Sequence, residues 1–217
     1  MATRKRDGAE RRRELCDAAI EVLALHGSRG LSHQRVDRHA GLPDGTTSYY
    51  FRTRAALVQA VGMRVADIDT ENLRSITAAG TRSNSPFGRL AQLVMLQADG
   101  RGLMLNRARQ ELALSATRDS ELSSTATEFV IRVNTMTQEA IAEVNPSSGD
   151  PASVAAAANA VLTFISGVLT RFALGDRAVT DSAELERLLH AIATAAYVAH
   201  VAEQPAEVEH GRRLHGA

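Results

Sequence analysis

Apolar residues recur every three or four positions along nearly the whole chain, and this helical period constrains the fold more than any other feature. Val, Ile, Phe and Tyr form no convincing alternating run, whereas Ala, Leu, Arg and Glu, which favour helices, dominate the sequence. Within residues 10–26, for example, Leu15, Val22 and Leu25 fall on one helical face. We therefore expect an all-α fold of about nine helices.

Glycine, proline and capping residues divide this pattern into separate helices. Ser32 suits the N-cap of a short helix that Gly41 ends, and Thr53 suits the N-cap of a longer one. Asp150 followed by Pro151 is a typical helix start. The predicted helices span residues 10–26, 33–40, 45–51, 54–76, 86–98, 103–117, 120–144, 151–174 and 181–203.

The chain divides into two units that differ in charge. The expected domains are residues 1–53 and residues 54–203, followed by a tail at 204–217 that lacks periodicity and is expected to be disordered. The whole sequence holds 25 basic and 25 acidic residues, but residues 1–60 hold 11 Lys and Arg against 7 Asp and Glu. A basic N-terminal unit favours a polyanionic partner such as nucleic acid.

Composition also bears on membranes and on localisation. A run of about 18 uncharged apolar residues, as a membrane span needs, is not evident, so we expect no membrane partner. The N-terminus has no apolar stretch of the signal-peptide type. Cys16 is the only cysteine, which excludes an intrachain disulfide and fits a reducing compartment. We expect a cytoplasmic protein.

The segment "GLPDGTTSYYFRTR" at residues 41–54 places three aromatic residues between a glycine-containing turn and two arginines. The helices at 33–40 and 45–51, joined by a tight turn, have the spacing of a helix-turn-helix, whose second helix enters the major groove of DNA. Tyrosine hydroxyls can donate to phosphate oxygens, while the rings can cover thymine methyl groups. The pattern therefore predicts DNA binding through this segment, with Phe51 assigned to the protein core instead.

This region resembles the DNA-binding region of the tetracycline-repressor (TetR) family, in the runs "AAIEVLALHG" from residue 18 and "LSHQRVDRHAGLPDGTTSYYFRTRAAL" up to residue 57. The positions in register are Ala18, Ala19, Gly27, Ser32, Val36, Ala40, Gly41, Gly45, Thr46, Tyr50, Phe51 and Leu57. The resemblance covers about the first 60 residues, and the remainder matches only in helix number and length. It implies a helix-turn-helix domain followed by a helical ligand-binding and dimerisation domain.

The resemblance implies DNA contacts from both helices of the pair and from the turn after them. Gln34 matches a base or phosphate contact, His33 matches a phosphate contact, and Arg54 takes the place of a common phosphate-binding lysine. Thr46 and Thr47 match the exposed start of the recognition helix. The candidate DNA-binding residues are Ser32, His33, Gln34, Arg35, Thr46, Thr47, Ser48, Tyr49, Tyr50, Arg52 and Arg54.

Two positions depart from the family pattern. Ser48 stands where the family usually has a tyrosine that grips phosphate, so that contact is shortened or lost. Asp37 replaces a common alanine and puts a negative charge in the first helix of the pair. Whether this charge pairs with Arg35 or Arg38, or weakens the affinity for DNA, stays open at this point.

Two helices near the C-terminus carry small and apolar residues that permit close helix approach. They can bury within their own domain or form a four-helix interface between two chains, and the resemblance favours the homodimer. The candidate interface residues are Ala155, Ala158, Leu162, Ile165, Leu169, Leu188, Ile192 and Ala196. Two recognition helices about 34 Å apart would then read a palindromic operator in double-stranded DNA.

The resemblance further implies a repressor that an unknown small molecule releases from DNA, with its pocket among the middle helices at about 86–172. A ligand that prefers the conformation with wrongly spaced recognition helices would shift the population away from DNA, with helix 54–76 as the lever. Methionines and phenylalanines could line the pocket and polar side chains could orient the ligand, although each could equally be core or solvated. The candidates are Met95, Gln97, Met104, Arg107, Gln110, Phe129, Arg132, Met136, Thr163, Arg171 and Phe172.

Sequence motifs of helical enzymes are missing. A Glu-x-x-His spacing of the di-iron type occurs only at Glu207 and His210, in the tail, and neither a zinc-protease motif, a phosphate-binding loop nor a nucleophile elbow is found. Cys16 has no evident activating base for a redox role. We expect no catalytic residue, cofactor or metal site. The alternatives are a helical protein-interaction module or an enzyme, neither of which would bind DNA.

Overall fold

The computed structural model describes residues 2–78, 85–116, 131, 133–143, 150–177 and 179–203, and every regular element among them is a helix. This confirms the all-α fold. The helices are α1 (Ala2–Gly30), α2 (His33–His39), α3 (Thr46–Tyr50), α4 (Arg54–Ala78), α5 (Pro86–Met95), α6 (Gly100–Ala116), α8 (Pro151–Ala173) and α9 (Ser182–Glu203), and residues 133–143 are also helical. The first part of the helix expected at 120–144 and the whole tail at 204–217 lie outside the described residues.

Local capping chemistry explains most helix ends. The side chains of Ser32, Thr53 and Asp150 each accept hydrogen bonds from backbone N–H groups of the first turn they precede, as predicted. Gly27 has φ 66° and ψ 177°, so it interrupts α1 at the predicted end. The other differences are of extent: α1 begins at residue 2 rather than 10, α5 ends at Met95 rather than 98, and α6 begins at Gly100 rather than 103.

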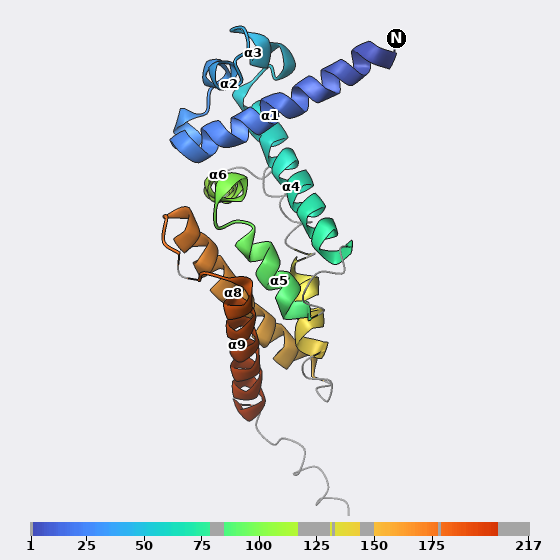
Figure 1. Ribbon diagram of the computed structural model, residues 1–217, viewed down its shortest axis with the longest axis vertical. Coiled ribbons are helices and arrows are strands. Elements are labelled where there is room, and N and C mark those ends of the chain that lie inside the picture. Colours follow the sequence, from blue (N-terminus) through green and yellow to red (C-terminus); the bar gives the residue numbers. More distant parts are fainter. Residues whose placement is uncertain are drawn as a thin grey trace, which may run out of the picture.

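The N-terminal core is shared between helices α1, α2 and α4 and one later helix, α6. Figure 1 shows α2 and α3 at one end of an elongated molecule, with α1 lying across α4 and α6 beneath α1. Side chains of α1, α2 and α4 form one buried cluster with Phe51, and Leu105 and Ala108 of α6 belong to the same cluster. The domain boundary expected after residue 53 stays a prediction, but the core of the first unit extends across it.

A second core holds the body together. It joins α5, residues 133–143, α8 and α9, and its largest buried side chains include Phe87, Phe172 and Leu189. Each such side chain contributes roughly 1.5–3 kcal/mol by leaving water. Ala158 and Ile165 are buried in this core within a single chain. Their assignment to a dimer interface stays a prediction, but the core of a single chain already buries both side chains.

The expectation that no segment could span a membrane was wrong as regards length and composition. In the part of the chain that the structure describes, one helix, α8, is long and apolar enough to cross a membrane by these two criteria, and 33% of the tested window is buried. The core helix of a soluble protein passes the same test. α8 packs against α6 and α9. The consequence is an apolar helix whose outer face the chain itself leaves largely uncovered.

Candidate nucleic-acid interface

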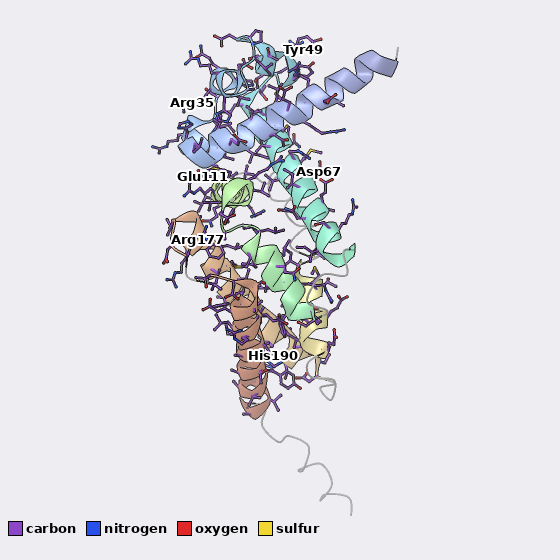
Figure 2. All side chains as sticks on the ribbon, viewed as in Figure 1. Arg35, Tyr49, Asp67, Glu111, Arg177 and His190 are labelled. Carbon is purple, nitrogen blue, oxygen red and sulfur yellow. The ribbon has the colours of Figure 1, made fainter. Side chains whose placement is uncertain are left out.

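The short helix α3 presents one tyrosine to solvent and holds the other against the protein. Tyr49 is 75% exposed, and Figure 2 shows it at the α3 end of the molecule, directed away from the body. Tyr50 is half-buried against the N-terminal core and meets Tyr49 edge to face, with ring centroids 5.1 Å apart. Phe51 is buried, as predicted. The two tyrosines therefore differ in their availability to DNA.

A residue of α1 that sequence reasoning missed supports these aromatic rings. The guanidinium carbon of Arg12 lies 5.7 Å from the centre of the Tyr50 ring and 5.2 Å from that of Phe51. At these distances a cation is attracted to the electron-rich ring face. The spacing of 38 residues between Arg12 and Tyr50 carries no local signal, so only the packing of α1 beside α3 could reveal the contact.

Asp37 has a different partner from those considered above. Its side chain is fully buried and accepts hydrogen bonds from Gly45 N at 2.8 Å, from Thr47 N at 2.7 Å and from the Thr47 hydroxyl at 2.5 Å. Neither Arg35 nor Arg38 pairs with it among the described residues. The negative charge that looked unfavourable for DNA binding therefore caps the first turn of α3.

Thr47 was expected at the exposed start of the recognition helix, and this was wrong. The residue is fully buried, because its backbone N–H and its hydroxyl both point at Asp37. Thr46 is half-buried, and its hydroxyl donates to the carbonyl of Pro43 at 2.7 Å. Among the α3 candidates, only Ser48 and Tyr49 are exposed.

Three of the basic candidates for phosphate contact are already engaged within the protein. The His33 Nε2–H donates to the carbonyl of Phe51 at 2.7 Å, which fixes α2 to the residue after α3. Arg35 donates to the carbonyl of Gly30 at 2.9 Å, and Arg54 donates to the carbonyl of Ser28 at 2.6 Å. Arg35 and Arg54 therefore both bind the C-terminal end of α1.

Four of the candidate DNA-binding residues have exposed side chains that make few or no hydrogen bonds within the protein. The side chains of Arg52, Ser48 and Tyr49 are exposed and make no hydrogen bond or ion pair with other described residues. Gln34 is exposed and makes only a long contact of 3.4 Å with the Asp44 carboxylate. Ser32 is also exposed, although its hydroxyl serves as the N-cap of α2. These side chains form the surface that the fold leaves available to a duplex.

Polar contacts join α1 to α4 and α6. Asp17 of α1 accepts from Arg64 of α4 at 2.8 Å and from Arg101 of α6 at 3.2 Å. Further along α6, Glu111 accepts from the Ser28 N–H at 2.8 Å, next to the interruption of α1 (Figure 2). A cavity of about 380 Å³ opens between α1, α4 and the α5–α6 turn, with Asp17 and Arg64 in its wall.

A second polar cluster lies between α4, α5 and α6. Arg109 donates to both carboxylate oxygens of Asp69, at 2.5 and 3.1 Å, and to the side-chain oxygen of Gln97. Burial raises the pKa of Asp69, although the neighbouring Arg109 opposes this by attraction and by hydrogen bonding. Gln97 was a candidate for binding a ligand, and the structure gives it a partner within the protein.

The other ligand candidates are not gathered around one cavity formed by described residues. Met104 lines the cavity beside α1, Met95 lines another beside α5, and Arg171 lines a third between α8 and α9. Arg107 and Gln110 donate to carbonyls of α8, Phe172 is core, Thr163 is exposed and Met136 is half-buried. Phe129 and Arg132 lie outside the described residues. A shared pocket for these residues stays a prediction.

Metal and thiol chemistry find no support in the described residues. No group of three or more His, Cys, Asp and Glu side chains in that part of the chain is placed to hold a metal ion. Cys16 is buried, and its burial, with the nearby Asp17, raises its thiol pKa to about 11. A thiol with such a pKa is protonated at neutral pH and reacts slowly.

Comparison with known proteins agrees with the geometry of α2 and α3. Residues 15–61 match the family model for bacterial regulatory proteins of the tetR family. Residues 15–61 therefore form a DNA-binding domain of the TetR family of transcriptional regulators. TetR-family regulators are transcription factors without catalytic activity, which confirms the expectation that the protein is not an enzyme. No curated protein matches the sequence.

Solved structures, two of them described as TetR-family proteins, share the fold over most of the chain. A regulator from Mesorhizobium loti is 21% identical with a TM-score of 0.63, covering 89% of this chain and 97% of its own. A TetR-family member from Streptomyces coelicolor is 25% identical with a TM-score of 0.61, covering 84% and 98%. The multidrug binding protein EbrR, in complex with ethidium, is 24% identical with a TM-score of 0.54, covering 84% and 98%.

Proposed function

We propose that this TetR-family regulator acts in the cytoplasm as a homodimeric repressor, which binds a palindromic operator and is released by a small molecule. The observation that carries the proposal is the exposed face of α3. Tyr49 and Ser48 project from a helix whose other side is fixed by Asp37 and the core. An exposed aromatic ring and hydroxyl on a recognition helix are suited to thymine methyl groups and phosphates.

Phosphate contacts would come from the residues around α3. Arg52 follows α3 directly and is exposed, and Ser32 and Gln34 lie at the exposed start of α2. The family resemblance supports the assignment of His33, Arg35, Tyr50 and Arg54 to the same interface. The hydrogen bonds that three of them make inside the protein favour a supporting role, in which they fix the segments that carry the exposed side chains.

The uncovered apolar face of α8 and α9 supports the homodimer. Leu174 is 80% exposed, and Leu188 and Val198 are exposed on α9. Ala155 is exposed, and Leu162, Leu169, Ile192 and Ala196 are half-buried on the same two helices. A Cβ atom added at Gly167 would meet open space, so a second helix can approach closely there. A second copy of the chain would cover this face.

Release by a small molecule is supported by the cavities and by the relationship to EbrR. EbrR is described as a multidrug binding protein and was solved with ethidium, an organic cation. The cavity beside α1 also holds Arg64 and Arg101, but both pair with Asp17. The carboxylates of Glu21 and Glu71, which neither arginine contacts, lie in the same wall with Ile20 and Ile68 and suit a cation that carries apolar groups. The effector of this chain would be sought first among such compounds.

The experiment that tests the proposal is operator selection. The purified full-length protein is used to select duplexes from a random library, and the sedimentation of the protein–DNA complex gives its stoichiometry. We expect an inverted repeat bound by two chains, with an affinity that falls as salt rises. Selection of no preferred sequence would refute operator binding, and a single chain on a non-repeated site would refute the dimer. Failure of every tested ligand, including organic cations, to release the DNA would count against the effector.

A further inference from the structure

The recognition helix cannot cap its own first turn. α3 has only five residues, so its N-terminal backbone N–H groups have few partners within the helix. Its N-cap is Gly45, whose φ of 94° lies in the left-handed region that side-chain-bearing residues rarely adopt. The backbone conformation therefore favours glycine over the Ser, Thr, Asn and Asp residues that normally cap a helix at this position, and glycine has no side chain to act as a cap. A cap has to come from elsewhere in the fold.

Asp37 of α2 supplies that cap through both carboxylate oxygens. One oxygen accepts from Gly45 N, and the other accepts from Thr47 N and from the Thr47 hydroxyl. Thr46 N donates to the Pro43 carbonyl, and Tyr49 N donates to the Gly45 carbonyl. The N–H groups of Gly45, Thr46, Thr47 and Tyr49 are thus occupied inside the protein, and the buried Asp37 carboxylate lies behind them.

We propose that Asp37 is the positioning residue of the recognition helix, fixing the orientation of α3 and closing its N-terminus to phosphate. The consequence is that α3 reads DNA through its exposed side chains and not through its backbone amides. This inference rests on the proposed DNA binding of the chain. It adds that sequence discrimination depends on a buried carboxylate that never touches the duplex.

A residue that positions α3 affects specific DNA binding more than non-specific binding, whereas a residue that only stabilises the fold affects both. Non-specific binding needs only charge near phosphates, whereas specific binding needs the α3 side chains in register with base edges. Loss of the Asp37 cap should therefore lower the affinity for the operator and spare the affinity for unrelated DNA. Removal of a negative charge should, if anything, strengthen the non-specific binding.

The test compares Asp37→Ala with two matched variants. Thr47→Val keeps the shape of the side chain and both backbone hydrogen bonds to Asp37, and loses only the hydroxyl bond. Asp44→Ala removes an exposed acidic group next to α3 that accepts only a 3.4 Å contact from Gln34. Each full-length variant is titrated, at one salt concentration, against the duplex that the parent selects and against an unrelated duplex of equal length.

We expect Asp37→Ala to weaken operator binding by about 10- to 100-fold while the affinity for unrelated DNA is unchanged or higher, since specific binding exceeds non-specific binding by about 10³-fold or more. Thr47→Val should stay within about threefold of the parent, and Asp44→Ala should keep the parent's ratio of the two affinities. Unchanged operator affinity in Asp37→Ala would overturn the proposal. An equal loss on both duplexes would overturn it too.

Hydrogen exchange gives a readout that needs no DNA. In Asp37→Ala the backbone N–H groups of Gly45 and Thr47 should exchange at least about tenfold faster than in the parent, while those of Val22 and Val61 in the core keep their protection. Equal acceleration at all four positions would show loss of the whole domain and sink the positioning role. If the parent selects no operator, the proposed function fails, and this exchange pattern still decides whether Asp37 positions α3.

Discussion

Replacement of Arg54 by alanine distinguishes a phosphate ligand from a structural clamp. The guanidinium donates to the Ser28 carbonyl at 2.6 Å, to the Ser28 hydroxyl at 3.2 Å and to the Leu31 carbonyl at 3.4 Å. A hydrogen bond from a charged donor contributes about 1.5–3 kcal/mol in a buried setting. Because Arg54 is exposed, solvent reduces this to roughly 0.5–1 kcal/mol for each short bond. Its removal should cost about 1–2 kcal/mol of unfolding free energy.

Arg52 provides the matched control two positions earlier. It is exposed and has no hydrogen-bonding partner among the described residues, so Arg52→Ala should change the unfolding free energy by less than about 0.5 kcal/mol. For a chain of this size, the Arg54→Ala cost corresponds to a fall in Tm of roughly 2–8 °C. Operator affinity should fall in both variants. Only Arg52→Ala should reduce the slope of log affinity against log salt, by about 1, as the loss of one phosphate contact does.

Calorimetry measures the unfolding free energy, and fluorescence anisotropy at several salt concentrations measures the operator affinity and its salt slope. Arg54→Lys is the third variant, because it keeps the charge but cannot reproduce the planar set of donors, so it should lose part of the stability and keep the salt slope. The reasoning is refuted if Arg54→Ala melts with the parent and lowers the salt slope by about 1. Arg54 would then be a phosphate ligand of the kind that the family resemblance implies.

Three further predictions follow from the same structure. Tyr49→Ala should weaken operator binding by about 1–3 kcal/mol in an anisotropy titration and cost less than about 1 kcal/mol of stability, because the exposed ring contacts mainly Tyr50; unchanged binding would remove it from the interface. Cys16, with its pKa raised to about 11, should be alkylated by iodoacetamide at about pH 8 only as fast as the protein unfolds, so rapid labelling of the native protein would contradict its burial. Because burial raises the pKa of Asp69 above its ordinary 3.8, its contribution to stability is fully present below that value and is lost as pH rises through the raised pKa. Urea unfolding between about pH 3 and about pH 7 should therefore show the parent losing stability relative to Asp69→Asn, and a constant difference would contradict the shift.

The helices could be predicted because their signals are local. Caps at Ser32, Thr53 and Asp150 act within three residues, and the left-handed glycines at positions 41 and 175 end helices through their own backbone. The extension of α1 to residue 2 was missed, since residues before Leu15 are polar on every face and show no apolar stripe. A helix without an apolar stripe gives no periodic signal in the sequence.

The interior of the candidate site could not be predicted, because its contacts are tertiary. Asp37 reaches Gly45 and Thr47, which are 8 and 10 residues away on another helix, and no spacing rule covers such a contact. Arg54 was chosen for its charge and its position after α3, both of which are correct, yet the segment that it binds lies more than 20 residues earlier. Sequence patterns identified the residue types at the surface and missed which of them the fold already uses.

The route from the body to the DNA-binding unit involves α6 as well as the continuous helix α4. A single helix entering the N-terminal core fixes a pivot but leaves rotation about its own axis unopposed. α6 opposes that rotation at two separate points: Leu105 and Ala108 are buried in the same core, and Glu111 accepts from the Ser28 N–H at the end of α1. A displacement of α6 along α8 must therefore carry the end of α1 with it or break the bond to Ser28. We expect either outcome to change the angle of α2 relative to the body, because Arg35 of α2 and Arg54 of α4 both donate to carbonyls at the C-terminal end of α1.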